Sequence, residues 1–187
     1  MRYPSDHKQA SRAKIVDMAG HLFRERGIAS TGVDAVMAGV GLTAGGFYNH
    51  FKSKNALVAE VVRSTIRANR ERLLAGLVDE DEAFIAGFIR KYVSARHRDQ
   101  PETGCPITAL GSELPHVEES LPVAAEELET YVSIFAERLH ARGERTPRQR
   151  ALALFAMMVG AIVVARTVKG TGLSDEILAA CRAVGAP

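Results

Sequence analysis

Apolar residues recur at intervals of three and four positions along most of this 187-residue chain, which is the pattern of amphipathic α-helices. The first clear example contains Ile15, Met18, Ala19, Leu22 and Phe23, whose side chains share one face of a helix. The alternation of apolar and polar residues that marks a strand is almost absent. We therefore expect an all-α fold of about nine helices, in which a three-helix N-terminal unit precedes a larger helical domain.

Capping residues, glycines and prolines predict where the helices begin and end. Helix starts are expected at Ser5 or Asp6, Thr31 in a capping box with Asp34, Thr43, Ser53, Asp81, Ser120 with Pro122, Thr146 with Pro147, and Ser174. Helix ends are expected at Gly27, Gly41, about Phe51, residue 78, about Asp99, Gly143 and about Lys169. Prolines and a glycine interrupt residues 103–114, so at most a short helix is expected there.

Residues 31–54, TGVDAVMAGVGLTAGGFYNHFKSK, contain two short predicted helices separated by a tight turn at Gly41 and Leu42. Apolar side chains on both helices would form a small shared core that fixes the angle between them and pushes the second helix outward. The side chains expected in this core are Val36, Val40, Leu42, Phe47 and Phe51. This arrangement is a helix-turn-helix, whose second helix enters the major groove of DNA.

The second helix of this motif carries side chains suited to DNA. Gly45 and Gly46 each cost about 1 kcal/mol in a helix relative to alanine. They allow either a close approach of DNA to the backbone or close packing against the first helix. Asn49 can read adenine edges, and hydroxyl, imidazole and ammonium groups can bind phosphates. The expected phosphate contacts are Thr43, Tyr48, His50, Lys52 and Lys54, with backbone N–H groups at the next helix start.

Residues 8–58 resemble the N-terminal domain of the TetR family of regulators. The matching residues are Leu22, Phe23, Gly27, Gly41, Leu42, Thr43, Gly45, Phe47, Tyr48, His50, Phe51, Lys54 and Leu57. The resemblance implies a homodimer with a DNA-binding domain in residues 1–54 and a ligand-binding and dimerisation domain in residues 55–187, connected by a helix over 55–78. The expected DNA-binding residues are Thr31, Thr43, Ala44, Gly45, Gly46, Tyr48, Asn49, His50, Lys52 and Lys54.

Ala44 departs from the family pattern, because many relatives carry a long polar side chain there. This departure leaves Asn49, with Thr43, as the main reader of base edges, and gives methyl contacts and DNA shape a larger part in specificity.

The C-terminal part is similar to the LmrA/YxaF-type subgroup of the same family. The similarity is carried by Gly104, Cys105, Pro106, Leu110, Glu113 and Leu114. It implies an apolar pocket between helices for a small apolar or aromatic effector. The expected lining residues are Phe84, Phe88, Tyr92, Cys105, Leu110, Leu114, Tyr131, Phe135 and Met157. The alternative for each of them is an ordinary place in the packed core.

Cys105 admits two interpretations. It stands next to a predicted helix start, where a thiolate is favoured, so it could sense electrophiles or oxidants. Alternatively, it is a small buried apolar side chain.

The last two predicted helices are strongly apolar, and the first of them needs cover on all sides. The family resemblance implies that they form a four-helix dimer interface with the symmetry-related pair, and the alternative is a helix buried in the monomer core. The expected interface residues are Leu152, Phe155, Val159, Ile162, Ile177, Leu178 and Cys181.

The composition is that of a cytoplasmic protein, and the charge distribution is compatible either with a phosphate-binding end or with an ordinary variation of surface charge. The net charge is only +2, but residues 1–54 hold eight basic and four acidic side chains. The N-terminus has no apolar secretion signal, and the apolar run 151–165 is short for a membrane span. The two cysteines form no C-x-x-C pair, so neither a zinc ribbon nor a thioredoxin-type motif is supported. We expect reduced thiols, no membrane association and no cofactor.

Three alternatives are an enzyme, a metal sensor and a structural adaptor without a ligand, which would bind DNA indifferently to small molecules. For an enzyme, no Ser/His/Asp or Cys/His arrangement is legible, and the glycines at 39, 41, 45 and 46 lack the spacing and the preceding strand of a phosphate-binding loop. A metal sensor could use Cys105, His97, His116 and Glu113, but their spacing matches no standard site. The sequence therefore predicts a dimeric regulator that binds a palindromic operator and is released from it by a small-molecule inducer.

Overall fold

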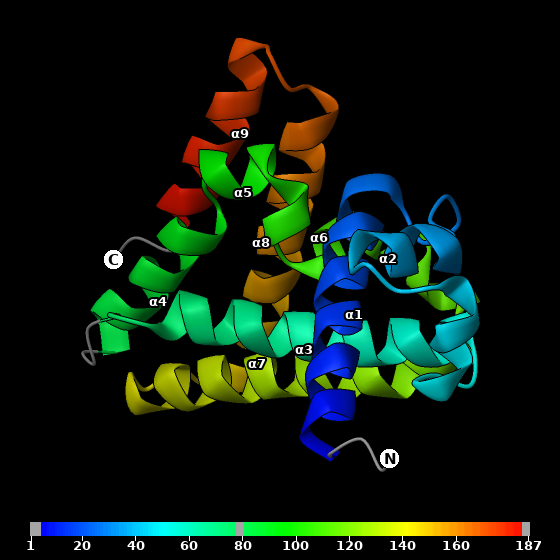
Figure 1. Ribbon diagram of the computed structural model, residues 1–187. Helices are drawn as coiled ribbons and strands as arrows, with labels where there is room; N and C mark the ends of the chain where they lie inside the picture. Colours follow the sequence, from blue (N-terminus) through cyan, green and yellow to red (C-terminus); the bar gives the residue numbers. More distant parts are fainter. Residues whose placement is uncertain (1–4, 78–80, 185–187) are drawn as a thin grey trace.

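The computed structural model describes residues 5–77 and 81–184. Within these residues, all regular secondary structure is helical (Figure 1). The predicted all-α fold is confirmed. The α-helices are α1 (Ser5–Arg26), α2 (Val33–Gly39), α3 (Lys54–Leu74), α4 (Asp81–Tyr92), α5 (Ala95–Asp99), α6 (Pro106–Leu110), α7 (Leu121–Ala141), α8 (Pro147–Thr167) and α9 (Gly172–Ala183). Short 3₁₀ helices are η1 (Ala44–Asn49), η2 (Pro101–Thr103), η3 (Leu114–His116) and η4 (Glu118–Ser120).

The long helices arrange the molecule around α3. In Figure 1, α3 and α7 lie side by side, and α1 crosses α3. Helix α8 packs against α7 and α9, and η2 and α6 contact α1. The segment that contains η2 and α6 therefore joins the larger domain to the first helix of the N-terminal unit.

Most of the predicted helix boundaries are confirmed. Gly27, Gly41 and Gly143 have φ angles of 90°, 70° and 77°, which glycine adopts without a steric penalty and which end or turn the chain after a helix. Ser53 caps α3, because its hydroxyl accepts a hydrogen bond of 3.0 Å from the Ala56 N–H. Local capping chemistry thus fixes the entry into the helix that connects the two domains.

Other predicted boundaries are wrong. The helix expected over 81–99 is broken, because the Ser94 side chain accepts from the His97 N–H at 3.3 Å and starts α5. Helix α9 begins at Gly172, and the expected cap Ser174 instead donates to the Ala165 carbonyl at 2.8 Å. The connector α3 ends at Leu74, before the expected residue 78, which lies outside the described residues.

The interior of the larger domain is an aromatic cluster that joins α4, α7 and α8. The Phe88 ring contacts Phe135 edge-to-face at a centroid distance of 4.8 Å, and Tyr131 meets Phe155 at 5.3 Å. Such pairs contribute about 0.5–1.5 kcal/mol each beyond their buried area.

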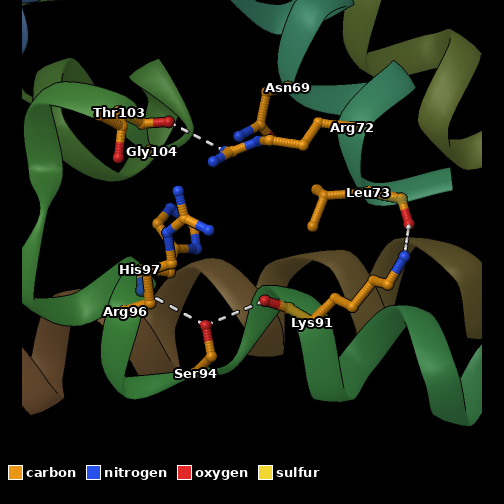
Figure 2. A pocket seen from close by; sticks show the side chains of 9 residues that line it. All are labelled: Asn69, Arg72, Leu73, Lys91, Ser94, Arg96, His97, Thr103 and Gly104. Carbon is orange, nitrogen blue, oxygen red and sulfur yellow. Dashed lines mark hydrogen bonds between the residues drawn. The ribbon is translucent and has the colours of Figure 1, made fainter. Parts of the chain in front are cut away.

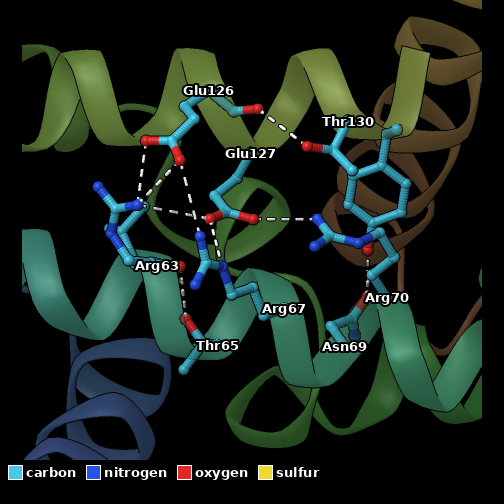
Figure 3. A network of polar contacts seen from close by, with 10 residues as sticks. Arg63, Thr65, Arg67, Asn69, Arg70, Glu126, Glu127 and Thr130 are labelled. Atoms are coloured by element: carbon cyan, nitrogen blue, oxygen red, sulfur yellow. Dashed lines mark hydrogen bonds and ion pairs between the residues drawn. The ribbon is translucent and has the colours of Figure 1, made fainter. Parts of the chain in front are cut away.

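A buried carboxylate also ties α7 to α3 (Figure 3). The Glu127 side chain is 2% exposed. Its oxygens lie 2.6 Å from Arg67 Nε and 3.0 Å from Arg70 Nη1. Arg63 also approaches it, at 3.9 Å, and pairs more closely with the exposed neighbour Glu126. The network holds the connector against the core through one carboxylate that is shared by three arginines.

Candidate nucleic-acid interface

The helix-turn-helix core orients η1 through Phe47. This side chain is fully buried, and its ring stacks on Phe51 at 5.5 Å. The next residue, Tyr48, is 73% exposed and meets Phe47 edge-on at 5.3 Å. Burial of Phe47 therefore turns the opposite side of η1 to solvent. The predicted DNA-contacting residues that are exposed here are Thr43, Ala44, Gly45, Tyr48, Asn49 and Lys52, and Gly46 and His50 are half-buried.

Two details of this motif differ from the sequence prediction. The second helix is a short 3₁₀ helix that ends at Asn49, rather than a helix that continues to Phe51. Leu42 is 39% exposed and so contributes little to the small core, whose centre includes Val36 and Met37.

Gly45 stands on the open side of η1. A Cβ built at this position would meet no protein atom within 4 Å. The interpretation in which Gly45 packs against the first helix is therefore wrong, and the free space lies where DNA would approach. A Cβ at Gly46 would lie 3.7 Å from both Met37 and Thr43, which places Gly46 within the motif.

A groove of about 460 Å³ adjoins η1 on the side of α1. Lys8 and Ser11 of α1 line it together with Thr43, Asn49 and His50. Sequence reasoning missed Lys8 and Ser11, although they lie one turn apart on the helix that precedes the motif and could have been assigned to one face. The groove adds an ammonium and a hydroxyl from α1 to the DNA-facing side.

His50 is held so that its ring faces this groove. Its backbone carbonyl accepts from the Arg12 guanidinium, which lies 4.0 Å from the Phe51 ring centre and pairs with Glu60. Its Nδ1 atom is buried without a hydrogen-bond partner. Burial, followed by the charges of Lys8 and Arg12, lowers the pKa of His50. A phosphate in the groove would place a negative charge beside Lys8 and His50.

Two predicted DNA contacts have structural partners inside the protein. Thr31 is 2% exposed, and its hydroxyl donates to the Gly27 carbonyl at 2.8 Å. The structure therefore removes Thr31 from the DNA-facing surface and also from its expected role as the cap of α2, whose N-cap is Gly32. Lys54 Nζ donates to the Ile28 carbonyl at 2.5 Å, so one of its three donors fixes the loop between α1 and α2.

The residues predicted to line an apolar effector pocket lie mostly in the packed core. Eight of them are buried and Met157 is half-buried. The same domain has a cavity of about 340 Å³ between the end of α3, the junction of α4 with α5, and η2, and none of these nine residues lines it. The eight buried residues are Phe84, Phe88, Tyr92, Cys105, Leu110, Leu114, Tyr131 and Phe135.

Cys105 lies in a tightly packed, hydrogen-bonded corner. It is fully buried, and burial raises the pKa of its thiol. Its backbone N–H donates to His97 Nε2 at 3.0 Å, while His97 Nδ1 donates to the Tyr92 carbonyl at 2.8 Å. A buried thiol with a raised pKa matches the interpretation of Cys105 as an apolar core residue, and the thiol-sensor alternative is not favoured. Within residues 5–77 and 81–184, no group of three or more potential ligands could hold a metal ion.

Helix α8 is long and apolar enough to cross a membrane by length and composition, yet it has two distinct faces. Ile162 and Leu178, which were predicted in the dimer interface, are buried within the protomer, and Phe155 contacts the aromatic cluster. These three residues therefore do not form the outer face. The outward face consists of Leu152, Ala153, Ala156, Val163 and Val164, with Gly160 opening onto free space, and Leu173 of α9 is exposed as well.

A basic, outward-facing helix-turn-helix joined to a larger helical domain defines a DNA-binding transcriptional regulator. Residues 15–61 match the family described as "Bacterial regulatory proteins, tetR family", and residues 82–177 match "Transcriptional regulator LmrA/YxaF-like, C-terminal domain". The chain therefore belongs to the TetR family, and its C-terminal domain is of the LmrA/YxaF-like type. Members of this family regulate transcription and are not enzymes, in agreement with the sequence prediction.

Individual relatives agree with this assignment. The HTH-type transcriptional regulator YxaF of Bacillus subtilis is 28% identical over 85% of this chain and 86% of its own length. The HTH-type transcriptional repressor KstR2 of Rhodococcus jostii is 38% identical over 30% of this chain, and the match spans 28% of that protein. A solved TetR transcriptional regulator from Chloroflexus aurantiacus has a TM-score of 0.76 and 26% identity, over 95% of each chain.

Proposed function

We propose that this protein represses transcription by binding a roughly palindromic operator as a homodimer and that a small-molecule effector releases it. The observation that carries the proposal is the solvent-facing side of η1, held outward by the burial of Phe47. Residues 1–54 would form the DNA-binding domain and residues 55–187 the regulatory domain, with α3 as the connector. The relative KstR2 is named as a repressor, which supports this sign of regulation.

The exposed apolar face of α8 supports the dimer. Small residues allow two such helices to approach closely, and a second copy would remove Leu152, Val163 and Val164 from water. A second copy, rather than a lipid bilayer, would then cover this face, which agrees with a cytoplasmic location. Two-fold symmetry would place the two η1 helices in successive major grooves with centres about 34 Å apart, or a multiple of that distance.

The dimer would adopt two conformations that differ in the distance between its DNA-binding domains, and the effector would bind one of them more tightly. An effector that prefers the conformation whose spacing does not fit the operator would release the protein from DNA. An apolar or aromatic body is expected of it, as the similarity of the C-terminal domain to the LmrA/YxaF-like type implies.

A side chain that reads a base edge and a side chain that contacts a phosphate are expected to respond differently to mutation. Asn49→Ala is expected to cost about 1–3 kcal/mol on the preferred operator and to relax the preference at one base pair. Tyr48→Phe serves as the control, because loss of a hydroxyl aimed at a phosphate should weaken binding equally on all sequences. Titration of a set of single-base operator variants at one salt concentration separates the two patterns. Equal losses for Asn49→Ala on every sequence would exclude a base-reading role.

A further inference from the structure

A cavity of about 340 Å³ lies between the end of α3, the junction of α4 with α5, and η2 (Figure 2). Three basic side chains from three different helices line it, namely Arg72, Lys91 and Arg96. No acidic residue is among its lining residues, which are Asn69, Arg72, Leu73, Lys91, Ser94, Arg96, His97, Thr103 and Gly104. The cavity therefore combines three solvent-exposed cationic side chains with the apolar side chain of Leu73.

The basic groups make contacts with neutral oxygens at the cavity wall. Arg72 Nη2 donates to the Thr103 carbonyl at 2.9 Å, and Arg96 Nε reaches the Gln100 side-chain oxygen at 3.4 Å. Lys91 Nζ donates to the Leu73 carbonyl at 3.3 Å. Figure 2 shows the guanidinium groups of Arg72 and Arg96 directed toward the middle of the cavity. A bound carboxylate would give these cations the negatively charged, bidentate acceptor that arginine binds most strongly.

Uncharged groups complete a firm wall around these cations. Asn69 is 4% exposed, and its side-chain oxygen accepts from the Tyr131 hydroxyl at 3.2 Å, which fixes the amide beside Arg72. His97 is held neutral, because burial lowers its pKa to about 4, and both of its ring nitrogens have partners. A Cβ at Gly104 would lie 2.6 Å from the His97 ring, so backbone and ring are in direct contact.

We propose that this cavity is the effector site and that the effector is a small organic anion, a carboxylate attached to an apolar or aromatic body. The carboxylate binds Arg72 and Arg96, and the body lies along Leu73. A volume of about 340 Å³ falls at the lower end of the range for small-molecule sites, roughly 300–1,000 Å³. This inference rests on the proposed function and supplies the chemical class of its effector.

The same wall connects the cavity to the DNA-binding domain. Arg72 holds the Thr103 carbonyl of η2, and the adjacent Glu102 carbonyl accepts from Arg24 of α1 at 2.8 Å. A carboxylate that competes for Arg72 weakens its bond to η2. Because α1 contacts η2 and packs against the helix-turn-helix, a shift of η2 moves the DNA-binding domain. Effector binding and operator binding thereby oppose each other.

The test uses the full-length protein with benzoate and octanoate as probes and benzamide and octanamide as uncharged controls. Thermal unfolding is measured without DNA, and operator affinity is measured with and without each probe at fixed ionic strength. The proposal predicts that at least one carboxylate raises the melting temperature and weakens operator binding by about tenfold, within the usual range of allosteric coupling, while its amide does neither. Failure of both carboxylates to bind at millimolar concentrations overturns the proposal, and so does equal action of acid and amide.

Arg96→Gln tests the location of the site. Arg96 is exposed and its side chain makes only a long hydrogen bond to the Gln100 side chain, so its loss should leave the fold intact. The variant should need about tenfold more carboxylate for the same response. Arg90→Gln is the matched control, because Arg90 is an exposed arginine of α4 that does not line the cavity. Equal responses of the two variants overturn the assignment of the site.

The proposed function is tested separately, by operator binding without probe. Thermal stabilisation by a carboxylate reports on the effector site even if no operator is bound.

Discussion

Substitution of Gly160 and Val164 by glutamate is expected to make the protein monomeric and to weaken operator binding by about 1,000-fold, the lower end of the usual gap between specific and non-specific affinity. The two positions are four residues apart on α8 and face outward, since Val164 is 50% exposed and a Cβ at Gly160 would meet no atom within 4 Å. In a two-fold interface the double variant would bury four carboxylates without partners. Replacement of glycine by glutamate also favours the helix, so the protomer should still fold.

Mass measurement in solution, together with operator titration, checks this prediction. Leu121→Glu is the control, because it places a glutamate, one where the double variant has two, at an exposed apolar residue of a different helix, at the start of α7. The control should remain dimeric and bind the operator normally. A double variant that stays dimeric would show that the outward face of α8 is not the interface.

Glu127→Ala is expected to lower the free energy of unfolding by about 3 kcal/mol, because it removes the one buried acceptor shared by three arginines. Arg70 is only 14% exposed and would keep a poorly hydrated charge. For a chain of this length, the loss corresponds to a decrease of about 6–12 °C in melting temperature.

Glu126→Ala provides the matched comparison for this second prediction. Glu126 is the preceding residue of α7 and binds the same Arg63, but its side chain is 56% exposed. Its removal should cost less than about 1 kcal/mol. Thermal unfolding of both variants at one protein concentration gives the comparison, since dimerisation makes the melting temperature depend on concentration. Similar losses for the two variants would mean that burial of the Glu127 carboxylate has no special part in stability.

The sequence predicted the features of the fold that depend on local chemistry. Gly27, Gly41 and Gly143 mark chain reversals because few other residues adopt positive φ, and Ser53 caps α3 as its position before the helix suggests. The helix-turn-helix was predictable because its glycines, aromatic residues and polar residues stand at fixed spacings. The sequence pattern failed at Ser94 and Ser174, where a hydroxyl can either cap a helix or bond elsewhere, and only the tertiary neighbours decide.

The orientation of α8 could not be predicted, because a helix that is apolar on almost every side carries no signal that separates its faces. Ile162 and Val163 are both ordinary apolar residues in the sequence, yet one is buried and the other is 40% exposed. The candidate effector cavity was hidden for a different reason. Arg72 and Arg96 come from helices far apart in the chain and meet only through tertiary packing, so no spacing links them.

Selection of bound DNA from a random pool, with purified protein at one stated salt concentration, shows whether the protein binds a specific site as a symmetric dimer. Such a dimer is expected to enrich a palindrome whose half-sites are centred about 34 Å apart, or a multiple of that distance. The Gly160 and Val164 double glutamate variant is expected to recover no such palindrome. Enrichment of no sequence, or of a single unpaired half-site by the unmodified protein, would contradict specific binding by a symmetric dimer.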